Sequence, residues 1–398
     1  MSEDDSRLPR VSALLLSNWI VLIFVAAVQA VVPFIPLQAR DLGFGAATLG
    51  VLVGAQGLGA LLMSLPGAVW IDAVGPAKFA FVGSLATGLT LAALAFWPST
   101  LSLVLAVLTL GAAQTVVGMA GQMLVVAATA RNKQDRAISF HFFFVSLGLV
   151  AGPLLSASIL RAGGSIQQVF LAAGLACTVC GIVALSAFGV VRLNVAPRGD
   201  SSTGMLPLSP GIRVALVATF VTEFSYIVWA TFFPLAMQGA GYSPAFIGFA
   251  FSLRGLAIAS VRPALPLLLS RYTRLRALAA SLIALSGGLM LSAVPFSSAL
   301  SLAAALLFGV AVGLAIPIPL TLLVSENAVW SLGRLLGLRT FVNKAGYMLG
   351  PVLLGPVAGR TLGGALGIVA VMCAATGIWV LSRAPSSEEK VELSSERS

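Results

Sequence analysis

The chain repeats a six-residue motif at two places that lie almost half its length apart. The two copies are Gly148-x-x-x-Gly152-Pro153 and Gly346-x-x-x-Gly350-Pro351, which gives an offset of 346 − 148 = 198 residues in a chain of 398. The same offset relates further pairs across the first five apolar runs, among them Pro36 and Pro234, Gly50 and Gly248, Gly57 and Gly255, and Gly111 and Gly309. A repeat that spans half of a chain predicts two related structural halves.

The composition places both halves in a membrane. Hydrophobic residues make up 59% of the chain and charged residues 9%, with a mean hydropathy of +1.03. Soluble domains carry about 25% charged residues, and a membrane-spanning helix needs about 20 apolar residues. Apolar runs of that size occupy residues 11–36, 46–69, 78–97, 100–129, 138–160, 167–191, 213–236, 244–268, 276–296, 299–324, 336–359 and 362–382. We therefore predict an all-α polytopic membrane protein with 12 transmembrane helices in two pseudo-symmetric six-helix bundles.

The domain limits follow from the linker between the sixth and seventh runs. We expect an N-terminal six-helix bundle over residues 1–191, a linker rich in Pro, Gly and Ser over 192–212, and a C-terminal six-helix bundle over 213–383. Residues 384–398 are polar and are predicted to form a disordered tail. Two membrane half-bundles are the architecture of many secondary transporters.

The loop cations predict the orientation in the membrane. Most of them fall on one side of the predicted bundle, and only Arg40, Arg161 and Arg360 fall on the other. By the positive-inside rule, both termini and the linker lie in the cytoplasm. The net charge of +10 then reflects topology, so we expect no nucleic-acid partner. We expect an integral multi-pass protein of a bacterial cytoplasmic (inner) membrane.

Residue patterns that would indicate catalysis are missing from the sequence. It contains no nucleophile–His–acid set, no cluster with metal-ligand spacing and no phosphate-binding glycine loop, so we expect neither an enzyme nor a cofactor or metal. Cys177-x-x-Cys180 lies inside an apolar run and is interpreted as small packing residues. His141, the only histidine, opens the fifth run and is interpreted as an interfacial residue.

A loop motif after the second run resembles one known family. In "AVWIDAVGPAK", Asp72 and Gly75 occupy the acid and second-glycine positions of the pattern G-x-x-x-D-R-x-G-R-[RK]. With the six-plus-six arrangement, this resembles the major facilitator superfamily and implies its fold over nearly the whole chain. The resemblance also implies that the loop is a conformational latch. The first glycine and the basic positions are replaced by Ala68, Ala73, Pro76 and Ala77, so the latch departs from the family pattern.

The repeated motif itself resembles that of the twelve-span drug–proton antiporters within this superfamily. Glycines four residues apart allow two helices to approach closely, and proline removes a backbone donor and permits a bend. The resemblance implies proton antiport, with both copies of the motif as conformational hinges. Two features depart from the family. Ser156-Ala157 replaces the trailing glycines, and Gln114 stands where the antiporters usually carry an arginine in the fourth span.

Two ionisable residues lie deep within the predicted spans. Glu223 is about ten residues into the seventh run, and Arg254 is about ten residues into the antiparallel eighth run, at similar depth. Such groups are costly in hydrocarbon and are functional candidates. We interpret Glu223 as the proton-accepting acid and Arg254 as a substrate or proton-state gate that pairs with it. The alternative is a static structural ion pair.

Further polar residues are candidates for a substrate cavity. Thr219, Glu223 and Tyr226 follow i, i+4, i+7 spacing, so they are expected to share a helix face, with Trp229 nearby. Gln29, Gln114, Asn343 and Lys344 complete the predicted cavity. Lys344 is either a second substrate or coupling charge, or a side chain that extends to the interface. The presence of Arg254 and Lys344 gives an alternative, a cavity that is net positive and accepts carboxylates.

The sequence predicts a secondary active transporter that works by alternating access. The first hypothesis is proton-coupled efflux of a small amphipathic molecule or drug by a monomer in the lipid bilayer. The second is uptake or facilitated transport of an organic anion or metabolite, with Arg254 and Lys344 as carboxylate partners. The third, from another class of protein, is a membrane sensor that transports nothing.

Overall fold

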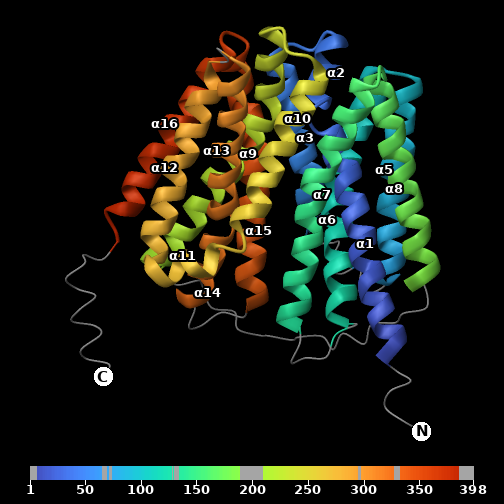
Figure 1. The fold of residues 1–398 in the computed structure, drawn as a ribbon, viewed down its shortest axis with the longest axis horizontal. Coiled ribbons are helices and arrows are strands. Elements are labelled where there is room, and N and C mark those ends of the chain that lie inside the picture. Colours follow the sequence, from blue (N-terminus) through green and yellow to red (C-terminus); the bar gives the residue numbers. More distant parts are fainter. Residues whose placement is uncertain are drawn as a thin grey trace.

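The structure is a computed structural model that describes residues 7–64, 70, 74–127, 129, 134–188, 209–294, 297–326 and 332–384. Its first half contains α1 (Arg7–Val31), α2 (Ile35–Asp41), α3 (Ala46–Ser64), α5 (Pro76–Phe96), α6 (Thr100–Ala127), α7 (Gln134–Arg161) and α8 (Ile166–Phe188). Its second half contains α9 (Pro210–Gly239), α10 (Pro244–Val261), α11 (Leu265–Arg271), α12 (Arg274–Ala293), α13 (Ser298–Ala315), α14 (Pro317–Glu326), α15 (Leu332–Ala358) and α16 (Leu362–Leu381). Figure 1 shows these helices side by side in one bundle.

Most of the predicted spans appear as long apolar helices. Eleven helical stretches within the described residues are long and apolar enough to cross a membrane. The one predicted span missing from these eleven is the eleventh run, residues 336–359, which corresponds to α15; this helix is long enough but carries Arg339, Asn343 and Lys344. Prolines divide three runs that the sequence predicted as continuous. α1 gives way to α2 near Pro33, α10 to α11 near Pro263, and α13 to α14 at Pro317, because proline cannot supply the backbone N–H that continues a helix.

The helices pair in the same way in each half. In the first half α5 packs against α6 and α8, α3 against α6, and α1 against α7 and α8. In the second half α12 packs against α13 and α16, α10 against α13, and α9 against α15 and α16. The two sets correspond helix by helix, as the 198-residue offset predicts. The limits of the predicted linker and tail fall mainly outside the described residues.

The repeated glycine motif brings helices together within each half. A Cβ at Gly148 would lie 2.9 Å from the carbonyl oxygen of Leu22 on α1, and one at Gly346 would lie 2.7 Å from the carbonyl oxygen of Phe220 on α9. Gly152 and Gly350 meet the same two helices one turn later. The sequence predicted that both copies of the motif act as conformational hinges. The structure shows that their glycines are close contacts inside each half, and their role as hinges stays a prediction.

Contacts between the halves use another set of glycines. α3 packs against α15, and α10 packs against α7. A Cβ at Gly57 would lie 2.7 Å from the Cα of Met348, and one at Gly255 would lie 2.8 Å from the carbonyl carbon of Leu149. The two glycines are equivalent by pseudo-symmetry, since 255 − 57 = 198, and so are the helices that they contact, α15 and α7. Pro153 and Pro351 remain inside the continuous helices α7 and α15.

The two halves meet toward one end of the bundle. We call it the distal end; it carries the turns at 42–45, 162–165 and 240–243 and lies opposite the start of α1 (Figure 1). There Gly50 meets Pro351, and Arg40 donates from Nη1 to Oε1 of Gln238 across the halves at 3.3 Å. The structure therefore holds the halves together at the distal end.

Candidate functional site

Glu223 lies near the middle of α9 and faces a polar stretch of α15. Its carboxylate accepts a hydrogen bond from the side chain of Asn343 and interacts electrostatically with Lys344 and, more weakly, with Arg339. All four side chains are half-buried, although they lie within the membrane-spanning part of the chain. The interacting partners of Glu223 thus come from α15, the helix that also packs against α3 of the other half.

The second copy of the glycine motif explains why α15 comes so close to Glu223. Gly346 and Gly350 lie against the backbone of Phe220 and Phe224, so α15 and α9 approach more closely than larger side chains would allow. Asn343 and Lys344 lie within the turn before Gly346 and are therefore delivered to the level of Glu223. The motif that the sequence marked as a hinge acts here by positioning the polar residues of the site.

Arg254 occupies a separate, fully buried place on α10. Its guanidinium carbon lies 4.8 Å from the ring centroid of Phe251, 5.1 Å from that of Tyr226 and 5.5 Å from that of Trp229. We call these three rings the aromatic cage. The Nε, Nη1 and Nη2 atoms of Arg254 have no hydrogen-bond partner among the described residues. Cation–π contacts stabilise its charge by roughly 0.5–2 kcal/mol each, but they leave its N–H donors unsatisfied.

The predicted ion pair between Glu223 and Arg254 is not present in this structure. Glu223 interacts with Lys344 and Asn343 instead, and Arg254 is enclosed by aromatic rings. Similar depth in neighbouring helices was the basis of the prediction. Depth fixes the height of a side chain in the bundle but leaves open the direction in which each helix turns it.

Tyr347 connects the two charged groups, and the sequence analysis overlooked it. It is half-buried and lies close enough to Glu223, Tyr226 and Arg254 to interact electrostatically with all three. The Lys344 ammonium lies 5.9 Å from the centroid of its ring. Its spacing of three residues from Lys344 and four from Asn343 is the signal that would have placed it on the same helix face.

Two predicted cavity residues lie in the packed core of the second half. Trp229 is fully buried, and its Nε1 donates to Oγ of Ser292 at 2.9 Å. It also stacks on Phe233 and Phe308, with ring centroids 4.4 and 4.6 Å away. Thr219 is buried, and its hydroxyl donates to the carbonyl of Ala215 at 2.8 Å. Neither side chain lines an accessible surface, because α9 is buried on several faces at once.

The predicted cavity residues of the first half are not linked to this cluster. Gln29 is buried with no partner for its Oε1 among the described residues, and Gln114 is half-buried on α6. No hydrogen bond between described residues joins either of them to Glu223 or Lys344. His141, expected at the interface, is buried, and its Nδ1 lies 3.0 Å from Oδ1 of Asn18 on α1.

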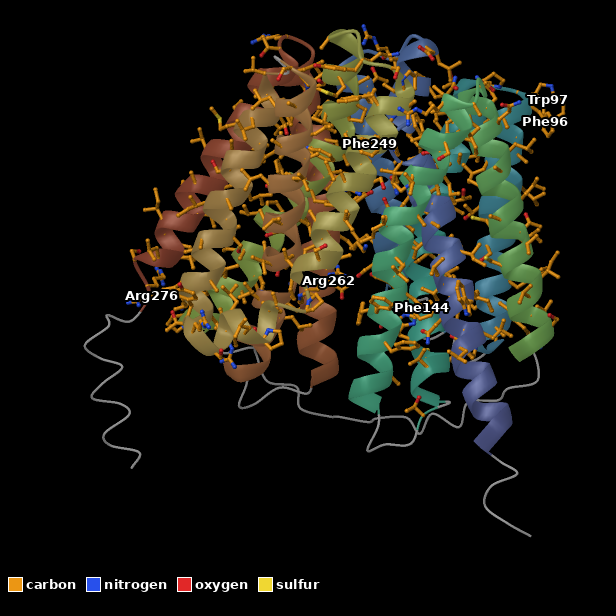
Figure 2. All side chains as sticks on the ribbon, in the orientation of Figure 1. Phe96, Trp97, Phe144, Phe249, Arg262 and Arg276 are labelled. Atoms are coloured by element: carbon orange, nitrogen blue, oxygen red, sulfur yellow. The ribbon has the colours of Figure 1, made fainter. Side chains whose placement is uncertain are left out.

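Arg262, at the end of α10, connects the second half to the first. Its Nη1 donates to Oγ of Ser146 on α7 at 2.6 Å, and it interacts electrostatically with Tyr226. Figure 2 labels Arg262 on the part of α10 that faces away from the distal end. A further cation, Arg339, donates from Nη2 to the carbonyl of Ile316 at 3.0 Å, at the break between α13 and α14.

The predicted latch can be followed only in part. Asp72 lies outside the described residues. Gly75 precedes α5 with a φ of 93°, a backbone conformation that favours glycine, and Pro76 then begins the helix. The role of the loop as a latch therefore stays a prediction.

Comparisons with known proteins agree with this architecture. A family model described as Major Facilitator Superfamily matches residues 18–351. Among solved structures, a mutant of the nucleoside transporter NupG superposes with a TM-score of 0.75 over 92% of this chain and 97% of the other, at 13% sequence identity. That likeness concerns the fold alone. A search of curated proteins returns no match. The helices, the repeat and the matched family model together show that the chain belongs to the major facilitator superfamily and is an integral, multi-pass membrane transporter.

Proposed function

We propose that this transporter takes up a small organic anion by alternating access, and that the anion binds beside α9 and α15. The observation that carries the proposal is the excess of positive charge around a single carboxylate. Within the described residues, Glu223 is the only acidic side chain that interacts with Lys344 and Arg339. Arg254 and Arg262 add two further cations, which contact the neighbouring Tyr226 and not Glu223. Buried charge without an equal counter-charge is costly, so a bound anion would stabilise the site.

The state of Arg254 supports the same conclusion. A buried guanidinium whose donors lack partners costs free energy that a carboxylate, sulfonate or phosphate group would recover through charge-assisted hydrogen bonds. Tyr226 and Tyr347 lie between Arg254 and the half-buried cluster around Glu223. We propose that Lys344 receives the anion first, and that Arg254 becomes accessible when these tyrosines move.

Alternating access is supported by the asymmetry of the contacts between the halves. The halves touch through α3 with α15 and α10 with α7, and at the distal end Gly50 meets Pro351 and Arg40 bonds to Gln238 across them. We interpret this as the state that is closed at the distal end. The opposite state would require these glycine-lined contacts to separate.

Proton coupling is proposed to act through Glu223. When Glu223 is ionised it offsets the charge of Lys344, and when it is protonated Lys344 is free to hold the anion. By thermodynamic linkage, protonation of Glu223 would therefore raise the affinity for the anion, and bound anion would raise the affinity for the proton. This coupling predicts that the anion and the proton move in the same direction.

Drug–proton antiport remains the second candidate, because Tyr226 and Tyr347 offer aromatic surface next to an acid. Aromatic faces and a carboxylate suit a cationic amphipathic molecule. Such a molecule would compete with the proton for Glu223, so its affinity would rise as the pH rises. The two candidates thus predict opposite effects of pH on binding.

Proteoliposomes with an imposed pH gradient separate these candidates. We suggest four probes: benzenesulfonate and succinate as anions, uridine as a neutral solute and tetraphenylphosphonium as a cation. Benzenesulfonate stays ionised and crosses bilayers poorly, so its accumulation would report the protein. We expect accumulation of at least one anion when the outside is more acidic, and loss of this uphill flux in Glu223→Gln. Uphill movement of only the cation, against the flow of protons, would contradict anion uptake and support antiport.

A further inference from the structure

A groove of about 560 Å³ lies between α7 and α10 at the distal end. Its wall on α7 includes Leu154, Ser158 and Arg161, and its wall on α10 includes Phe246 and Phe249. Figure 2 labels Phe249 on the part of the bundle toward the distal end. The groove lies apart from the cluster around Glu223, and the proposed function makes no use of it.

The groove is open to the surroundings of the bundle. Leu154 and Phe249, one from each wall, are both 44% exposed. Large apolar side chains with such exposure on a transmembrane helix face the hydrocarbon of the bilayer. We therefore expect the apolar part of the groove to be in contact with lipid acyl chains.

The distal edge of the groove carries a cation that has no partner among the described residues. Arg161 is the last residue of α7, and its exposed side chain makes no hydrogen bond or ion pair with a described residue. Arg40, another cation at this end, is instead engaged with Gln238. An arginine at the end of a span lies at the level of lipid headgroups, where its planar fork matches a phosphate group.

The spacing of these groups matches one lipid molecule. Leu154 and Arg161 are seven residues apart on α7, which corresponds to a rise of about 10 Å, less than the roughly 15 Å depth of one leaflet. Ser243 also lines the groove. Its side-chain oxygen accepts a hydrogen bond from the backbone N–H of Phe246, so its own O–H is available as a donor.

We propose that an anionic phospholipid binds in this groove, with its phosphate at Arg161 and Ser243 and one acyl chain along Leu154 and Phe249. Charge complementarity at Arg161 selects an anionic headgroup, and the exposed apolar walls select a lipid over a free anion. Basic pockets between transmembrane helices bind anionic headgroups on the matrix or cytoplasmic side of membranes, and this groove offers the same pairing of charge at the distal end.

The bound lipid would also bias the conformation of the transporter. The two walls of the groove belong to different halves. Beside the groove the halves are held together, because Gly248 lies against Pro153 and Ala157. Ser252 also donates to the carbonyl of Val150 across the same contact at 3.0 Å. Separation of the halves at this end would split the groove. A ligand that binds only one of two states stabilises that state, so the lipid stabilises the distally closed one.

Native mass spectrometry of the full chain tests this site. The purified protein would be equilibrated with phosphatidylglycerol or phosphatidylcholine and compared with Arg161→Gln. We expect the wild type to retain phosphatidylglycerol preferentially, and Arg161→Gln to lose about fivefold in affinity for it, the effect of one basic group. Arg360→Gln, a matched change of another exposed arginine at the distal end, should retain the wild-type preference.

Two further arms distinguish a lipid from other occupants. Ser158→Leu adds bulk to the exposed wall of the groove and should reduce retention of phosphatidylglycerol while Arg161 stays in place. Inorganic phosphate at the same concentration should not displace the lipid. Equal retention of both lipids by the wild type, unchanged retention in either groove variant, an equal loss in Arg360→Gln, or displacement by phosphate would each overturn the proposal.

Discussion

The two halves of the molecule share their packing and differ in their chemistry. In the first half, Gly111 on α6 lies against the backbone of Gln56 on α3; in the second half, Gly309 on α13 lies against the backbone of Arg254 on α10. Gly111 and Gly309 are 198 positions apart, and so are Gln56 and Arg254. The same helix crossing therefore presents an amide in one half and a guanidinium in the other. Small residues fix the spacing, and the side chain beside them is free to differ.

A second pair of equivalent positions also differs in its chemistry. Ser146 on α7 and Lys344 on α15 are also 198 residues apart. Ser146 accepts a hydrogen bond from Arg262, whereas Lys344 interacts with Glu223. The glycine motifs that follow them pack against α1 and α9 in the same manner. Both halves therefore share the packing, and we assign anion recognition to the second half.

The largest effect is expected when the shared packing is broken. Gly152→Val and Gly350→Val each place a side chain against the backbone of the neighbouring helix. Because that backbone cannot move without disturbing its own helix, we expect the free energy of unfolding to fall by about 3 kcal/mol, the upper part of the usual cost of overpacking. The yield of monodisperse protein on size exclusion measures this. Gly118→Val and Gly367→Val are matched controls, because nothing lies within 4 Å of a Cβ at either position. If only one half were sensitive, the packing would not be shared.

The next effect is expected when the second half is given the residue of the first at the anion site. Lys344→Ser removes the cation nearest Glu223 and should lower anion transport by about 10- to 100-fold, the value of a hydrogen bond to a charged group. Initial uptake rates of benzenesulfonate in proteoliposomes measure it. Lys78→Ser, which removes an exposed cation at the start of α5, is the control. Normal transport by Lys344→Ser would show that the anion does not bind at this site.

A smaller effect is expected from Arg254→Gln, which copies the residue at the equivalent position 56. We expect anion affinity to fall by about tenfold. The thermal stability of the ligand-free protein should stay the same or rise, because the change removes a buried charge whose donors lack partners. A clear fall in melting temperature without ligand would mean that Arg254 is a structural residue instead.

The smallest effect is expected at the contacts between the halves. Gly50→Ala adds a Cβ against Pro351 across the two halves and should move the equilibrium away from the distally closed state by about 1 kcal/mol, the lower end of the cost of overpacking. Spin labels at Thr48 and Arg360, both exposed at the distal end, would report a longer distance by pulsed electron resonance. Gly45→Ala is the control, since nothing lies within 4 Å of its Cβ. An unchanged distance in Gly50→Ala would contradict the proposed interface.

The fold could be predicted from the sequence because it depends on long-range regularities. Apolar runs predicted the helices, and the offset of 198 residues predicted that α7 and α15 would be equivalent. A glycine motif shows that a helix packs closely but does not name its partner. Gly148 and Gly346 were therefore predicted only as hinges, and the structure adds that they pack against α1 and α9 inside their own halves. The breaks at Pro33, Pro263 and Pro317 had a local signal that the apolar runs concealed.

The site could be predicted only in its composition. Glu223, Arg254, Asn343 and Lys344 stood out because ionisable and amide groups are rare in spans. Their pairing depended on helix rotation, which depth alone does not give, so the Glu223–Arg254 pair was wrong. Helical spacing grouped Thr219 with Glu223 on one helix face. Several helices surround α9, however, so Thr219 is buried against them instead of lining a cavity. Tyr347 carried no charge to draw attention, and it lies between the charged groups.

The most direct test is the effect of pH on the binding of a permanently ionised anion to the wild type and to Glu223→Gln. Benzenesulfonate does not titrate in this range, so any pH dependence belongs to the protein. We predict tighter binding to the wild type at acidic than at neutral pH, and tight, pH-independent binding to Glu223→Gln, because its Lys344 is no longer neutralised. Thr219→Val, one turn away on α9, should behave as the wild type. Weaker binding at acidic pH, or an unchanged pH dependence in Glu223→Gln, would contradict the account.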